Sequence, residues 1–149
     1  MVKSGDFMLM GEYHHSIDEK GRIIIPSKLR EELGENVIVT RGLDDCLFIY
    51  SYKEWMALVT KLKTLPFTKK DARSFTRIFL SGAVMNEFDK QGRIKISSPL
   101  MQYASLSKDC VIIGVNDRLE IWSYEKWNNF MNQSKKELAD LADHLFDDI

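Results

Sequence analysis

The stretch Gly11-Glu-Tyr-His-His-Ser-Ile-Asp-Glu-Lys-Gly-Arg22 decides the fold, because its pattern returns 71 residues later as Gly82-Ala-Val-Met-Asn-Glu-Phe-Asp-Lys-Gln-Gly-Arg93. Over residues 11–29 the two copies share eight identities, where unrelated sequences would share about one. A second block repeats at an offset of 72, aligning residues 47–55 with residues 119–127. The chain is therefore a duplicated unit.

Each copy of this stretch predicts a strand, a tight turn and a second strand. Asp18-Glu-Lys-Gly21 and Asp89-Lys-Gln-Gly92 have turn chemistry, because Asp accepts hydrogen bonds from backbone N–H groups ahead of it and Gly accepts a positive φ. The residues that follow, 22–25 and 93–96, are rich in β-branched side chains typical of strands. We interpret Asp18, Gly21, Asp89 and Gly92 as structural turn residues, and the two carboxylates as orienters of arginine rather than an acid/base pair.

The rest of each unit is predicted to be two more strands with helices around them. A short helix is expected over Ser27–Leu33, and a linking helix from Lys69 to about Leu80, with Thr68 and Asp71 resembling a capping box. A four-strand unit of about 45 residues buries little surface alone, so the two units should share one core. The expected divisions are a first unit at 11–57, a linking helical segment at 58–81, a second unit at 82–129 and a C-terminal helical tail at 130–149.

Composition indicates an ordinary globular protein with a charge asymmetry. Apolar residues make up 44% of the 149 residues and charged residues 29%, with a net charge of −1. Residues 1–100 hold 16 Lys/Arg against 13 Asp/Glu, and residues 101–149 hold 5 against 9. No apolar run approaches the roughly 20 residues that span a bilayer. Cys46 and Cys110 are expected to be reduced core thiols of a cytosolic protein.

Several of these stretches together resemble one known family. Those stretches are Gly11–Arg22, Thr40-Arg-Gly-Leu-Asp44, Leu65–Arg73, Ser81-Gly-Ala83 and Asp89–Arg93, and they closely resemble MraZ proteins. The resemblance runs from about Met10 to the C-terminus. The first nine residues depart from the family's usual short start, which leaves Met1, Met8 and Met10 as candidate native starts.

This resemblance implies both a fold and a function. The implied fold is α+β, with two tandem swapped-hairpin AbrB-like β units fused into one double-split β-barrel with flanking helices. The implied function is sequence-specific DNA binding by a transcriptional regulator, at direct repeats in the promoter of the bacterial division and cell-wall gene cluster. The implied assembly is a homo-oligomeric ring, and the implied location is the cytoplasm, at the nucleoid.

Arg22 and Arg93 are the first candidates for contact with double-stranded DNA. A rigid turn would aim each guanidinium outward, where it could bind guanine O6 and N7 or a phosphate. The alternative is a surface ion pair between Arg22 and Asp18; the repeat and the resemblance favour DNA contact. Further candidates are Lys20, Lys90 and Gln91 on the turns. Lys28 and Arg30 flank a face of the short helix and could touch phosphate, with a solvated helix face as the equal alternative. Because Lys20 falls on Gln91, the two copies should not contribute equal charge.

Other features favour plainer interpretations. The basic residues between 61 and 77 could form a phosphate-binding stripe, but we favour subunit packing or a solvated helix face as their role. His14 and His15 are strand neighbours that point to opposite faces, so we expect no metal site. The three tryptophans, like the phenylalanines, are expected in the core or an interface rather than stacked on bases.

The sequence carries no sign of an enzyme or a cofactor site. It has no Gly-rich phosphate loop, no nucleophile elbow and no metal-binding cluster. We therefore expect a protein without catalytic residues or cofactor, and with neither a membrane nor a small-molecule substrate as partner. The alternative function is an AbrB-fold protein-interaction module resembling an antitoxin.

Overall fold

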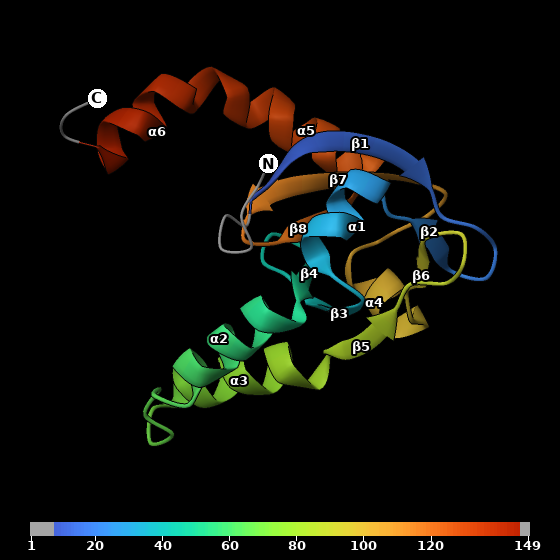
Figure 1. Cartoon of the computed structure of the whole chain (residues 1–149). Helices are drawn as coiled ribbons and strands as arrows, with labels where there is room; N and C mark the ends of the chain where they lie inside the picture. The colour runs from blue at the N-terminus through green and yellow to red at the C-terminus, as the bar shows by residue number, and fades with distance from the viewer. Residues whose placement is uncertain (1–7, 147–149) are drawn as a thin grey trace.

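The computed structural model describes residues 8–146, so Met1, one of the candidate starts, and the last three residues of the expected tail lie outside the description (Figure 1). The architecture is the mixed α+β class that was expected. The elements are, in order, β1 Leu9–Ser16, β2 Arg22–Ile24, α1 Ser27–Leu33, β3 Asn36–Arg41, β4 Leu47–Ser51, α2 Tyr52–Leu62, α3 Lys70–Ser81, β5 Val84–Glu87, β6 Arg93–Lys95, α4 Ser98–Tyr103, β7 Asp109–Asn116, β8 Leu119–Ser123, α5 Tyr124–Ser134, a 3-10 turn η1 Lys135–Glu137, and α6 Leu138–Leu145.

The strands of the two units interlock. Six of them form one antiparallel sheet in the order β1-β7-β8-β4-β3-β5, and β2 pairs with β6 in a separate two-stranded ribbon. The first strand of each unit pairs with the other unit: β1 lies along β7, and β5 along β3. Main-chain hydrogen bonds among the described residues leave the large sheet open, so they do not close the double-split barrel that the resemblance implied.

One hydrophobic core lies between the ribbon and one face of the sheet. The ribbon contributes alternate isoleucines, as the period of a strand requires, and α1 and α4 add leucines. The buried members of this core include Ile23, Ile25, Leu29, Ile49, Ile94, Ile96, Leu100, Ile112 and Ile121. Both units supply these residues, so each unit depends on the other for its burial.

A second, aromatic cluster lies on the opposite face of the sheet, under α2, α3 and α5. Trp122 and Trp127 are buried, and Trp55 packs against the cluster with its ring 5.6 Å from that of Phe79. This agrees with the expectation that tryptophans serve packing. Phe67 lies in neither cluster, and it is 81% exposed in the loop between α2 and α3.

Serine side chains begin the two equivalent helices. The Ser51 hydroxyl accepts a hydrogen bond from the Glu54 amide at the start of α2, and Ser123 does the same for Lys126 at the start of α5. The prediction of a capping box at Thr68 and Asp71 is wrong. The N-cap of α3 is Lys69 and has no side-chain cap, while the Thr68 carbonyl accepts a hydrogen bond from Arg73.

The ribbon and the helical extensions lie at different ends of the molecule. Figure 1 shows β2, β6 and their turns on one side, with the α2–α3 hairpin and the α5–α6 arm projecting on the other. Within residues 8–146 no helix has the length and apolar character needed to cross a bilayer. Because the ribbon and the helical extensions lie on different sides, a ligand bound at the turns would leave both extensions uncovered.

Candidate nucleic-acid interface

The first turn, between β1 and β2, is organised by the carboxylate of Asp18. Its Oδ1 accepts hydrogen bonds from the backbone amides of Lys20 and Arg22, both at 2.9 Å. Its Oδ2 accepts a hydrogen bond of 2.7 Å from Nε of Arg22. Gly21 closes the turn with φ +80°, which a residue with a side chain adopts at a cost. One carboxylate thus shapes the backbone and orients the arginine.

The second turn, between β5 and β6, repeats this geometry closely. Asp89 Oδ1 accepts from the amides of Gln91 and Arg93, both at 2.9 Å, and Oδ2 accepts from Nε of Arg93 at 2.8 Å. Gly92 has φ +78°. The ion pair predicted as an alternative role for Arg22 is therefore present, in both copies. It uses the Nε edge of each guanidinium, and so does not by itself exclude a ligand on the remaining nitrogens.

The two turns are held to each other by the ribbon strands. The carbonyl of Gly21 accepts a hydrogen bond from the Ile96 amide at 2.7 Å, and the carbonyl of Gly92 accepts one from the Ile25 amide at 3.0 Å. Each turn is therefore anchored by the strand that follows the other turn. The arrangement fixes the separation of the two arginines through the backbone.

Strand register places both arginines on the outer face of the ribbon. Arg22 lies opposite Lys95 and Ile24 opposite Arg93, while Ile23 and Ile94 form the pair between them. Opposed residues of an antiparallel pair share a face. Because the Ile23–Ile94 pair is buried in the core, the other two pairs face outward. The two guanidinium groups are therefore on one side, with Nη1 of Arg93 lying 3.8 Å from Oδ2 of Asp18.

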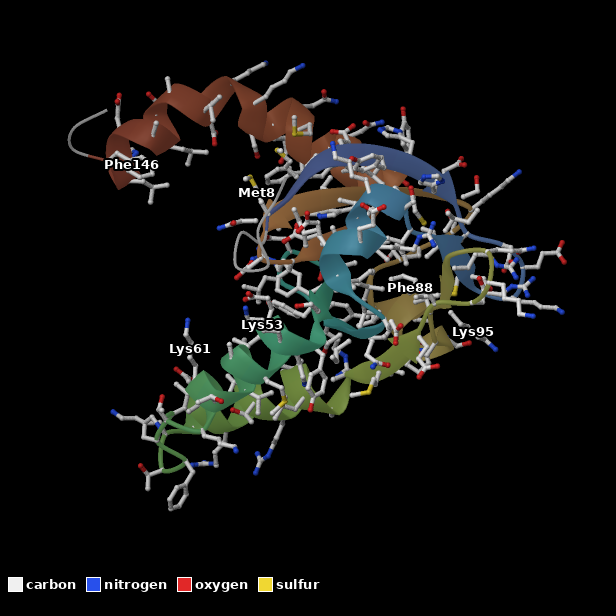
Figure 2. All side chains as sticks on the ribbon, viewed as in Figure 1. Met8, Lys53, Lys61, Phe88, Lys95 and Phe146 are labelled. Carbon is white, nitrogen blue, oxygen red and sulfur yellow. The ribbon has the colours of Figure 1, made fainter. Side chains whose placement is uncertain are left out.

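Lys95 is a third cation on this face, and the sequence analysis missed it. It is exposed, and Figure 2 shows it at the same end of the molecule as the turns. Its counterpart in the first unit is Ile24, so the repeat gave no signal for it. The alternation of Arg93-Ile-Lys95 could have found it, because residues two apart on a strand share a face.

The electrostatics of the turns favour fully charged groups. Hydrogen bonds lower the pKa of Asp18, first from the backbone amide of Arg22 and also from its side chain. The pKa of Asp89 is lowered in the same way by Arg93. Within residues 8–146 the Nη groups of Arg22 have no hydrogen-bond acceptor. Both arginines are partly exposed, at 33% and 23% of their side-chain area.

The other predicted contact residues have different positions. Lys20, Lys90 and Gln91 are exposed on the turns, and Lys28 is exposed on α1. Arg30, weighed with Lys28 as a phosphate contact, donates from Nε to the carbonyl of Ile25 at 2.9 Å and packs over the second turn. The basic residues between 61 and 77 lie on the α2–α3 hairpin, away from the turns (Figure 1).

The described residues offer no arrangement typical of metal binding. No group of three His, Cys, Asp or Glu side chains in residues 8–146 could hold an ion. His14 pairs with Glu12 at 2.7 Å instead. Cys46 and Cys110 are buried and free, and burial raises the pKa of Cys110 to about 11. Such thiols are poor ligands and poor nucleophiles.

Comparison with known proteins matches both units of the chain. Residues 8–78 and residues 79–149 each match the family described as "MraZ protein, putative antitoxin-like". The chain belongs to the MraZ family. It is 56% identical over 140 residues to the protein named transcriptional regulator MraZ of Thermoanaerobacter sp. (strain X514), covering 94% of this chain and 98% of that protein. The resemblance found in the sequence is thereby confirmed.

A weaker likeness concerns a solved structure. The solution structure of PHS018 from Pyrococcus horikoshii shares 13% sequence identity with this chain, with a TM-score of 0.33. The match spans 76% of this chain and 87% of that one. The two MraZ matches, in contrast, divide the chain so that residues 8–78 supply β1, β3 and β4 of the interlocked sheet and residues 79–149 supply β5, β7 and β8. The two Asp-x-x-Gly-Arg turns occupy equivalent positions in those units.

Proposed function

We propose that this chain is a sequence-specific DNA-binding transcriptional regulator that reads double-stranded DNA with the outer face of the β2–β6 ribbon. The observation that carries the proposal is the placement of Arg22 and Arg93 on one face, each oriented by a turn aspartate. The name of the 56% identical relative supports it. The protein would act by occupying a promoter, without covalent chemistry.

The two-stranded form of the ribbon suits the proposal. The major groove of B-DNA admits a two-stranded β-ribbon, and an arginine there can form two hydrogen bonds to guanine O6 and N7. Arg22 and Arg93 would read bases or hold phosphates, while Lys95, Lys20 and Lys90 would contact phosphates. Gln91 differs from Lys20 in offering both a donor and an acceptor, a pair that suits adenine. Lys28 would reach the backbone from α1.

We also infer assembly into a homo-oligomer, a ring, on direct repeats of the promoter of the division and cell-wall gene cluster. One ribbon offers few contacts, so useful affinity requires several protomers on one DNA, and linked sites can gain 10² to 10⁴ in affinity. Such a regulator would work in the cytoplasm at the nucleoid. The swapped pairing of β1 with β7 and β5 with β3 supports the AbrB-like, double-split barrel as the parent fold.

A titration on promoter fragments across a salt series tests the proposal. Arg22→Ala, Arg93→Ala and the double variant are compared with the wild-type chain, with a scrambled fragment as the control DNA. Loss of base contacts should remove the preference over scrambled DNA, by roughly 1–3 kcal/mol per lost pair of hydrogen bonds. Loss of phosphate contacts should flatten the salt dependence instead. Unchanged affinity and unchanged salt slope in the double variant would refute the proposal.

A second candidate function is a protein-interaction module that neutralises a partner, as an antitoxin does. The wording of the family description favours it. The two functions predict different responses in a pull-down from lysate: nuclease treatment removes partners that are bridged by DNA and leaves a directly bound toxin. Retention of one stoichiometric protein after nuclease treatment, insensitive to Arg22→Ala, would favour the antitoxin.

A further inference from the structure

The C-terminal arm exposes an apolar stripe that no other part of residues 8–146 covers. Leu138, Leu141 and Leu145 recur along α6 at spacings that place them on one face, and their exposures are 71%, 46% and 74%. Burying apolar surface is worth roughly 25 cal/mol per Å². A stripe of this kind on a projecting helix is therefore typical of a contact surface rather than of a solvated end.

A groove of matching character lies at the tip of the α2–α3 hairpin. Its lining combines apolar and basic side chains, and includes Leu62, Leu65, Phe67, Lys63, Arg73 and Arg77. Phe67 is the most exposed large apolar side chain of the described residues. The groove thus offers apolar contact and positive charge together.

The charges of the two surfaces are complementary. The hairpin, residues 52–81, carries seven Lys/Arg against two Asp/Glu. The arm from Glu137 to Phe146 carries three acidic residues and no Lys or Arg. Opposite fields of this kind steer association and fix the orientation of the partners.

The internal repeat relates the arm to the hairpin. Helix α2 corresponds to α5 at the offset of 72, so the helix that follows each of them, α3 in the first unit and α6 in the second, holds a comparable place in the chain. α3 carries Lys70, Arg73 and Arg77, whereas α6 carries Asp140 and Asp143 and no Lys or Arg. In the first unit α3 folds back on α2, where Phe79 stacks against Trp55. In the second unit α6 runs outward, away from both α5 and the hairpin (Figure 1).

We propose that the apolar stripe of α6 in one copy of this chain fills the α2–α3 groove of a second copy. The inference rests on the proposed function in one respect: the contact would join the subunits of the homo-oligomer proposed there. Because the arm and the groove are different surfaces, the contact is head-to-tail, and such contacts generate closed rings or open filaments. The ribbons stay uncovered, since they lie at the other end of the molecule (Figure 1).

A charge exchange between the two surfaces tests this contact. The full chain is prepared with Lys63→Glu and Arg77→Glu, with Asp140→Arg and Asp143→Arg, and with all four changes; Arg73 is kept because it donates to the carbonyls of Phe67 and Thr68. Light scattering measures the mass, and circular dichroism checks the fold. We expect the wild type to be a multi-subunit assembly, each double variant to be a folded single subunit, and the fourfold variant to regain the assembly.

A second pair of variants tests the apolar part of the contact. Leu141→Asp should give a folded single subunit, and Leu141→Met, its control, should assemble normally. A wild type of single-subunit mass, folded double variants of full mass, or a folded fourfold variant that stays single would each overturn the contact. Because the assembly is measured without DNA, these results are independent of operator binding, so a failure of the proposed function is read separately.

Discussion

Arg93 in the second turn lies within ion-pairing distance of Asp18 in the first, with 3.8 Å between Nη1 and Oδ2. Asp18 therefore touches both arginines, since it also accepts the Nε hydrogen bond of Arg22. Asp89 has no such second partner within the described part of the chain, where it pairs with Arg93 alone. The two turns are alike in geometry but unequal in their connections.

This inequality predicts different effects for two matched substitutions. Asp18→Asn should weaken operator binding more than Asp89→Asn, because it frees the orientation of two guanidinium groups rather than one. Fluorescence anisotropy with a labelled promoter fragment measures the difference, which we expect to be several-fold. Equal losses in the two variants would mean that the contact between Arg93 and Asp18 does not orient the arginine.

An exchange across the repeat tests the role of Lys95. Lys95→Ile gives position 95 the isoleucine that its counterpart, position 24, has in the first unit. Ile24→Lys makes the opposite change on the same face. If Lys95 contacts phosphate, its loss should reduce the slope of log affinity against log salt by about 1, and Ile24→Lys should steepen it by a similar amount. If both variants keep the salt slope of the wild type, DNA binds away from this face.

Three glycines with similar φ separate conformational strain from steric strain. An added Cβ would lie 2.8 Å from the Ile96 carbonyl oxygen at Gly21 and 2.5 Å from the flexible guanidinium of Arg30 at Gly92, but would meet nothing within 4 Å at Gly34. Gly34→Ala should therefore cost about 1–3 kcal/mol of unfolding free energy, from backbone conformation alone, because φ +83° with ψ −172° is a region that side-chain-bearing residues rarely adopt. Gly21→Ala should cost clearly more, and Gly92→Ala should lie between them. Urea unfolding of the three variants gives the order, which a Gly34→Ala loss as large as that of Gly21→Ala would contradict.

The lowered pKa values of Asp18 and Asp89 predict the direction of a pH effect. A carboxylate whose pKa is lower in the folded state stabilises it fully above the ordinary Asp pKa of about 3.9, and this stabilisation is lost as pH falls through the lowered value. The difference in unfolding free energy between the wild type and Asp18→Asn/Asp89→Asn should be constant from pH 8 to about pH 5 and shrink below that. A difference that grows on acidification would show that the sign of the shift is wrong.

Local features of this fold were predictable from the sequence. The Asp18 and Asp89 turns have patterns that depend on residues within five positions of each other, and helix α1 follows from Ser27–Leu33 directly. The duplicated pattern also predicted a shared core. The turns and the helix depend on hydrogen bonds or periodicity within one segment, which a sequence displays, and the shared core follows from the small size of each repeated unit.

Relations between segments were not predictable in this way. The pairing of β2 with β6, which sets Arg93 opposite Ile24 and exposes Lys95, joins residues about 70 positions apart. The supposed capping box failed because α3 begins later, at Lys70, and Arg73 takes the Thr68 carbonyl. Similarly, nothing in the pattern of residues 61–77 shows that these cations lie at the opposite end of the molecule from the turns.

The interlocking of two units within one chain also affects how the sequence of such a protein can evolve. Two identical hairpins from separate chains would alter both of their turns with every mutation. Fusion removes that constraint, since Glu19-Lys20 and Lys90-Gln91 can diverge while the Asp and Gly that shape each turn stay the same. At the two turns the backbone hydrogen bonds are repeated, and the asymmetry there lies in side chains such as Lys20 and Gln91.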